Sequence, residues 1–239
     1  MLFRSVKAVQ LGADMITIQG GEGGGHTGSV PTSILLPQVL DAVKVPVIAA
    51  GGLSTGRSLA AALAAGAAGI AMGTRFLMTS DSGVPAATLE RYLKVRDAEK
   101  IQISFLVDGM PQRMIPNEYL TMLEKASPLK RLRIALDLAL RWKAQTGMTT
   151  THALKVLWQG LREDTSSVAQ TVMASSAPML LQRSMVDGQP ADGVMSSGQV
   201  AALIGELVSC RDVIEGIVGD ARARIDDLTR KRFVENAHA

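Results

Sequence analysis

The sequence predicts an α/β fold in which short parallel strands alternate with helices. Three apolar segments have the length and residue content of buried strands: residues 15–18, 46–50 and 69–72. A glycine-bearing loop follows each segment at once, and helical segments lie between them. Parallel strands that each end in such a loop suit either a TIM barrel or a doubly wound sheet.

The helical segments complete the alternation. Residues 5–12 have the apolar spacing of a helix end, and Gly12-Ala13-Asp14 then turns into the first strand. Residues 32–43 form the next predicted helix, and residues 57–66 form another that is rich in alanine. Alanine allows a helix to pack closely against a sheet, so the expected order is β-α-β-α-β.

Beyond Phe76 the alternation stops. A helix is expected from Pro85 to Asp97, a short extra strand over residues 101–107, and a last helix from Cys210 to Lys231. Another helix is expected from Pro128 to Gln145, with one face formed by Leu129, Leu132, Leu136 and Leu140. We therefore expect a strand-bearing region over residues 1–80 and a mainly helical region over 81–239 that covers or extends it.

Composition excludes several classes of protein. The 239 residues carry 25 Lys and Arg against 22 Asp and Glu, and this balance gives little support to nucleic-acid binding. The single cysteine, Cys210, rules out a disulfide framework within the chain. No apolar run reaches the roughly 18 residues that span a bilayer. The expected partner is a small-molecule substrate, with no metal, no membrane and cytoplasmic residence; the oligomeric state stays open.

The glycines point to a ligand that approaches the backbone. Five of residues 20–25 are glycine, and Gly51-Gly52 and Gly73-Thr74 follow the second and third strands. Loops without side chains let backbone N–H groups surround a phosphate or a planar ring. One such loop alone is equally explained by a tight turn, but paired loops in this order favour a phosphate site.

Three motifs carry a resemblance to a known family. The segments Gln19–His26, Ala49–Leu53 and Ala71–Phe76 closely resemble, in order and spacing, those of the nitronate monooxygenase family. This family is also called 2-nitropropane dioxygenase-like, and the motifs are similar to those of its flavin-dependent enoyl-reductase relatives. The resemblance is strongest over residues 5–80 and continues more weakly through Val107–Arg113 and residues 193–218.

The resemblance implies an FMN-binding TIM barrel of which this chain holds the C-terminal part. Such a barrel has about 250 residues, and the three visible strands match its sixth, seventh and eighth. A small open α/β domain with no further strands is the alternative. The predicted FMN contacts, from the family motifs and the glycine loops together, are Gln19, Gly24, Gly52, Ala71, Met72, Gly73 and Thr74.

His26 is the predicted catalytic residue, because it stands where the family places its catalytic histidine. An imidazole can take a proton from the carbon beside a nitro group, or can orient an anionic substrate. Glu22 is expected to orient the loop. The implied activity is oxidation of an alkyl nitronate with O₂ to a carbonyl compound and nitrite. Two alternatives remain: an NAD(P)H-dependent FMN reductase or dehydrogenase of an unsaturated thioester or ketone, and a non-catalytic fragment.

Overall fold

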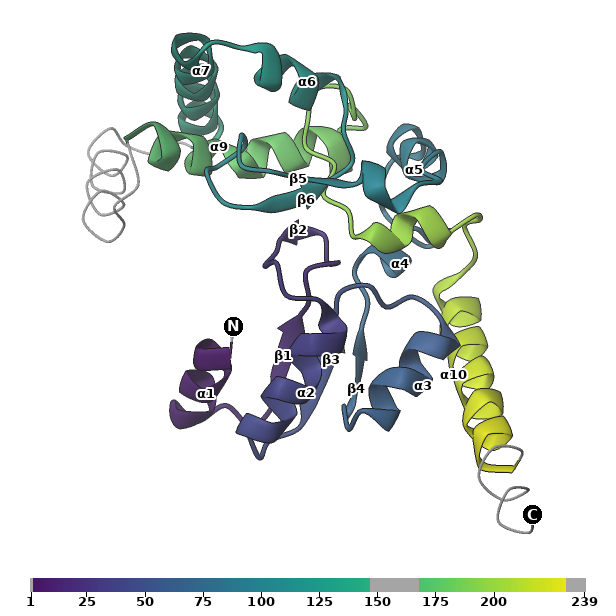
Figure 1. Ribbon diagram of the computed structural model, residues 1–239. Helices are drawn as coiled ribbons and strands as arrows, with labels where there is room; N and C mark the ends of the chain where they lie inside the picture. The colour runs from purple at the N-terminus through teal and green to yellow at the C-terminus, as the bar shows by residue number, and fades with distance from the viewer. Residues whose placement is uncertain (1, 147–167, 231–239) are drawn as a thin grey trace. The chain divides into compact units, whose positions relative to one another are not determined.

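The computed structural model describes residues 2–146 and 168–230, and contacts divide them into two compact units (Figure 1). We call the first the sheet unit: it contains the residues up to Ser82, Val95–Ala98 and the residues from Ser197 on. The second is the helical unit, which contains Gly83–Lys94 and the residues from Glu99 to Ser196. Each has its own hydrophobic core, so each is described by itself.

The sheet unit contains the predicted parallel strands. Strands β1, β3 and β4 pair in that order, with Ile16 opposite Val47 and Ile48 opposite Gly69. Its elements in chain order are α1 (Leu2–Gln10), β1 (Ile16–Gln19), β2 (Gly25–His26), α2 (Thr32–Ala42), β3 (Val47–Ala50), α3 (Gly56–Ala64), β4 (Gly69–Ala71), α4 (Thr74–Leu77), η2 (Gln199–Leu203) and α10 (Cys210–Asp227). The predicted α/β fold with three parallel strands is confirmed; the place of these strands in a barrel stays a prediction.

The core of the sheet unit follows from the alternation of side chains along a strand. Ile16 and Ile18 of β1 are buried, whereas Thr17 between them is exposed on the opposite face. Leu35 and Val39 of α2 are almost fully buried in the same cluster. Burial of apolar side chains from strand and helix holds the strands in register and so fixes where each strand ends.

Helix α10 packs along α3, although about 150 residues separate them in the chain (Figure 1). Its Val213, Ile217 and Ala221 are buried, as the apolar spacing predicts. At Gly56, a Cβ atom would lie 2.5 Å from Asp220 Cβ and 2.6 Å from the Ala221 backbone nitrogen. Glycine at this position therefore lets the two helices approach each other.

In its described residues, the helical unit has an antiparallel hairpin and the longer helices α5, α6, α7 and α9. Strands β5 and β6 pair with Gln102 opposite Met114. Its elements are α5 (Ala86–Leu93), β5 (Gln102–Ser104), β6 (Gln112–Met114), α6 (Glu118–Lys125), α7 (Pro128–Thr146) and α9 (Val168–Met185), and η1 (Ala98–Lys100) spans the boundary in sequence. The strand predicted over residues 101–107 is present but shorter, and its partner β6 was not predicted.

Buried polar groups organise the helical unit. Asn117 caps the N-terminus of α6, and its Nδ2 donates to Pro190 O and Gly193 O, each at 2.7 Å. The hydroxyl of Tyr92, a fully buried residue, donates to Ser196 O at 2.6 Å. Burial raises the pKa of this phenol, so it remains a donor. These hydrogen bonds connect the loop before η2 to α5 and to the start of α6, which lie more than 70 residues earlier in the chain.

Three leucines of the face predicted for α7 are exposed, and the side chain of the fourth, Leu132, lies outside what the structure describes. Leu129, Leu136 and Leu140 are 60%, 46% and 66% exposed. Ile134 instead packs against the core cluster that contains Tyr119. Helical spacing shows which side chains share a face, but the contacts of the fold decide which face is covered.

Candidate cofactor site

The carboxyl ends of the three parallel strands bring the predicted cofactor residues to one edge of the sheet. Gln19, Ala50 and Ala71 stand opposite one another as the last residues of β1, β3 and β4. The three glycine-bearing loops therefore start side by side. In open and closed parallel sheets alike, this edge is where ligands bind. Met72 and Ala71 are half-buried there, so their backbone borders the edge.

The first loop is held in shape by side chains. Gln19 Nε2 donates to His26 O at 3.0 Å and lies 3.4 Å from Gly24 O. Thr27 Oγ1 donates to Gly20 O at 3.2 Å and closes the loop. A Cβ atom at Gly23 would lie 2.5 Å from the Gln19 amide, so glycine is needed for that amide to cross the loop. The Gln19 amide nitrogen is thus committed to the loop backbone.

Glu22 joins the first loop to α2 and, through it, to the second loop. Its carboxylate accepts from Thr32 N at 3.0 Å, and the Thr32 hydroxyl lies 3.0 Å from Glu22 Oε2. The same hydroxyl is 2.8 Å from Gly51 O. A carboxylate at a helix N-terminus is favoured by the helix dipole and by the unpaired N–H groups there. These contacts support the expectation that Glu22 orients the loop.

The backbone conformation of the second loop itself requires glycine. Gly51 and Gly52 have φ angles of 92° and 73°, which other residues rarely adopt. A Cβ atom at Gly51 would lie 2.9 Å from Gly20 N, so the first two loops touch through their backbones. At Gly52 the Cβ would lie 3.0 Å from Glu22 Cβ. A side chain at either position disturbs the loop before it meets any ligand.

The third loop leaves empty space beside Gly73. A Cβ atom at Gly73 would have no neighbour within 4 Å, and the residue is exposed. Thr74 Oγ1 accepts from Gly198 N at 2.9 Å, which leaves the hydroxyl proton available to donate elsewhere. Gly73 is therefore the glycine beside which a bound group has room to approach the backbone.

Arg75 has a buried nitrogen without a partner among the described residues. Its Nη2 donates to Met78 O at 2.9 Å, but Nε is buried and forms no hydrogen bond there. Burial lowers the pKa of this guanidinium, and Glu206 opposes the shift. A buried unsatisfied cationic donor is costly, and an anionic group next to it removes that cost. Together with the open side of Gly73, this donor fits a phosphate-bearing cofactor.

The sequence alone did not identify the contribution of the segment around Gly198. Gln199 N donates to Glu22 O at 3.0 Å, and Gly198 N binds the Thr74 hydroxyl. At Gly24, a Cβ atom would lie 2.5 Å from Gly198 N. This segment thus connects the first and third loops. Its partners are more than 120 residues away, and the signal in the sequence is the weaker family resemblance over residues 193–218.

His26 lies at the end of the first loop with an exposed side chain, in β2. Its role in catalysis stays a prediction. Among the described residues, no group of three or more His, Cys, Asp or Glu side chains has the arrangement of a metal site. In the same part of the chain, none of the helices is both long enough and apolar enough to cross a membrane.

The model of the family described as nitronate monooxygenase matches residues 4–220. The chain belongs to this family. Members of the nitronate monooxygenase family are oxidoreductases and in general depend on a flavin.

Three relatives illustrate the range of the family. A Rhodococcus jostii protein named (3aS,4S,5R,7aS)-5-hydroxy-7a-methyl-1-oxo-octahydro-1H-indene-4-carboxyl-CoA dehydrogenase is 46% identical over 93% of this chain and 63% of its own length. A probable nitronate monooxygenase of Staphylococcus saprophyticus is 34% identical over 46% of this chain and 34% of its own. The structure of FabK from Thermotoga maritima, 27% identical, superposes with a TM-score of 0.67 over 95% of this chain and 60% of that one. The chain thus spans less than two thirds of each relative.

Proposed function

We propose that the chain is an FMN-dependent oxidoreductase that acts on a coenzyme A thioester. The observation that carries this proposal is the extent of the match to the Rhodococcus CoA dehydrogenase, 46% identity over 222 residues. A match that long includes most of the helical unit as well as the sheet unit. The probable nitronate monooxygenase matches over only 120 residues. The thioester hypothesis, an alternative in the sequence analysis, therefore takes precedence over nitronate oxidation.

The proposed FMN site uses the three loops at the sheet edge. Gly73 offers its open side, Thr74 a hydroxyl proton, and Arg75 its buried Nε–H for the phosphate. Ala71 and Met72 border the same edge, while Gln19 shapes the first loop with its amide nitrogen. Gly24 and Gly52 support the site indirectly, since both are required by contacts or conformation within the chain. When bound, the flavin supplies two-electron chemistry.

His26 is the proposed proton-transfer residue. Its exposed imidazole lies at the end of a loop that is anchored by Gln19 and Thr27. One imidazole nitrogen would take up or release the proton that accompanies hydride transfer at the thioester's carbon chain. An anchored loop keeps that nitrogen in place, and this matters because general catalysis depends on close positioning.

The test compares two substrate classes on one preparation. The chain is loaded with FMN and mixed, without oxygen, with a bicyclic hydroxy-carboxyl-CoA thioester of the kind in the relative's name. Reduction of the flavin by the thioester supports the proposal. Nitrite release from an alkyl nitronate in air, with no reaction of the thioester, overturns it in favour of the nitronate activity. Absence of flavin binding supports the third alternative, a non-catalytic fragment.

Nitronate oxidation is the second candidate, because the description of the family model names it. It has a distinct signature at His26. If His26 removes a proton from carbon, His26→Asn should keep FMN bound and should lose activity on the neutral nitroalkane by about 10²- to 10⁴-fold. Activity on the nitronate, which has already lost that proton, should fall much less. Equal losses on both substrates would instead assign His26 to substrate positioning.

Two further parts of the proposal concern context. We propose that β1, β3 and β4 correspond to the sixth, seventh and eighth strands of a TIM barrel. The similarity to FabK supports this placement. NAD(P)H remains the proposed second cofactor if the thioester is reduced. Oxidation of NAD(P)H that depends on an unsaturated thioester would support this direction of the reaction. Cytoplasmic residence accompanies the proposal as an expectation.

A further inference from the structure

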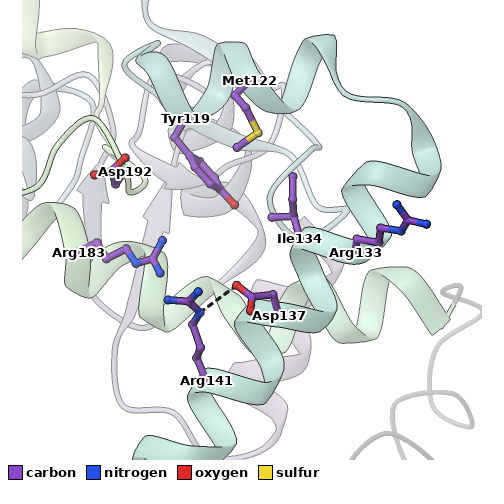
Figure 2. Close-up of a pocket in the computed structure, with 8 residues that line it drawn as sticks. All are labelled: Tyr119, Met122, Arg133, Ile134, Asp137, Arg141, Arg183 and Asp192. Atoms are coloured by element: carbon purple, nitrogen blue, oxygen red, sulfur yellow. Dashed lines mark hydrogen bonds and ion pairs between the residues drawn. The ribbon is translucent and has the colours of Figure 1, made fainter.

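A cavity of about 470 Å³ lies in the helical unit, between α6, α7 and α9 (Figure 2). None of its lining residues belongs to the sheet unit. A smaller hollow of about 280 Å³ shares Arg141 and Arg183 with it. Cavities of roughly 300 to 1,000 Å³ with a few convergent polar groups are typical ligand sites. The geometry points to a binding site for a phosphate ester, with the phosphate between Arg141, Arg183 and the hydroxyl of Tyr119.

The two arginines come from different helices and converge. Figure 2 shows the guanidinium groups of Arg141, from α7, and Arg183, from α9, side by side. Arg141 Nε donates to Asp137 Oδ2 at 2.9 Å, so its terminal nitrogens remain as donors. No hydrogen bond or ion pair of the Arg183 side chain is found within the described part of the chain. Adjacent guanidinium groups repel each other, and an oxyanion between them relieves that repulsion.

Tyr119 supplies a third donor. The residue is only 9% exposed, and its hydroxyl points into the cavity, on the side where Asp137 lies (Figure 2). Among the described residues this hydroxyl has no hydrogen-bond partner. Burial raises the pKa of the phenol to about 12, and Arg183 opposes the shift. A phenol that is protonated at neutral pH is a hydrogen-bond donor, and a phosphate oxygen in the cavity is an acceptor that it can bind.

The rest of the lining indicates an organic body on the phosphate. Met122, Ile134 and the Tyr119 ring form an apolar wall. Asp192 also lines the cavity, on the side of Arg183 away from Arg141, where its carboxylate can accept from sugar hydroxyls. Three arginines and two aspartates leave the lining with a net charge of +1. The class of ligand that fits this lining is a nucleotide phosphate, such as the one at the adenosine end of coenzyme A or of NADPH.

The test measures binding directly on the full chain, without flavin or turnover, so it is independent of the function proposed above. Isothermal titration calorimetry compares adenosine 3′,5′-bisphosphate, adenosine 2′,5′-bisphosphate, inorganic phosphate and adenosine. We expect a bisphosphate to bind more tightly than phosphate or adenosine. Preference for the 3′ isomer identifies the coenzyme A end as the source, and preference for the 2′ isomer identifies NADPH. Absence of bisphosphate binding, or equally tight binding of inorganic phosphate, overturns the proposal.

Three variants locate the site. Arg183→Gln should weaken bisphosphate binding about 10- to 150-fold, and Tyr119→Phe about 2- to 10-fold, because they remove a charged and a neutral donor respectively. Arg133→Gln is the matched control: it removes the same charge from α7, but its guanidinium points away from the pair (Figure 2). It should change affinity less than about twofold. Equal losses of affinity in Arg133→Gln and Arg183→Gln would mean that the overall positive charge of the surface, and not a specific site, determines binding. That result would refute the proposal.

Discussion

Gly73→Ala separates a ligand-contacting glycine from glycines that the fold itself requires. Gly73 has φ −84° and ψ −68°, a conformation open to any residue, and a Cβ atom there would have no neighbour within 4 Å. Alanine at such a position stabilises a protein by about 0.4 to 1 kcal/mol, chiefly by restricting the unfolded chain. The added methyl group would, however, occupy the space beside the proposed phosphate contact. Loss of one backbone bond to an anion costs about 1.5 to 3 kcal/mol, or about 10- to 150-fold in affinity.

The assay pairs FMN titration by fluorescence quenching with urea unfolding followed by circular dichroism. Gly73→Ala should raise the Kd for FMN while the urea midpoint stays equal or rises. Gly24→Ala is the opposite control, because its Cβ would lie 2.5 Å from Gly198 N and Ser197 C. Overpacking against backbone atoms costs about 1 to 3 kcal/mol, so that variant should lose stability. An unchanged FMN affinity in Gly73→Ala would refute the assignment of this loop to the phosphate.

Three further predictions test individual contacts. Glu22→Gln should lower the free energy of unfolding by about 1 kcal/mol in urea, since the N-terminus of α2 loses its carboxylate; an unchanged value would mean that the contact is not stabilising. Tyr92→Phe should cost about 1 to 2 kcal/mol in the same assay, because the buried Ser196 carbonyl loses its donor. The Arg91 guanidinium bonded to Glu118 lowers the pKa of that carboxylate, so the pair stabilises the fold above the ordinary pKa of Glu and is lost as pH falls through the lowered value. Arg91→Met should raise the Glu118 pKa toward its ordinary value in an NMR titration, although a backbone hydrogen bond still lowers it, and a pKa that does not move would contradict the pairing.

The parallel strands and their loops could be predicted because their signals are local. A few β-branched residues followed by glycines mark a strand end, and three such ends in order imply a shared sheet edge. Residues 15–18 and 46–50 were therefore placed within one or two positions of β1 and β3. Helix α10 was predicted for the same reason, since Val213, Ile217 and Ala221 keep helical spacing over several turns.

The features that sequence analysis missed depend on contacts between distant residues. Strand β6 is three residues long and carries Gln112 and Arg113, so it has no apolar alternation. The contact between Gly198 and Thr74 joins residues 124 positions apart. The exposure of Leu136 depends on how α7 packs and not on its own spacing. In each case the deciding partner lies outside any window in which a periodic pattern can be recognised.

The glycines show most clearly what a sequence leaves undecided. A glycine in a loop indicates that a side chain would be harmful, but it does not say what that side chain would meet. At Gly24 the obstacle is the chain's own backbone, at Gly52 it is the backbone conformation, and at Gly73 the chain offers no obstacle. The family resemblance predicts Gly24 as an FMN contact, the glycine-loop pattern predicts Gly52, and both predict Gly73. Of these three glycines, Gly73 is therefore the one where the chain leaves room for a bound group, and a substitution there tests the proposed phosphate contact without disturbing the loop itself.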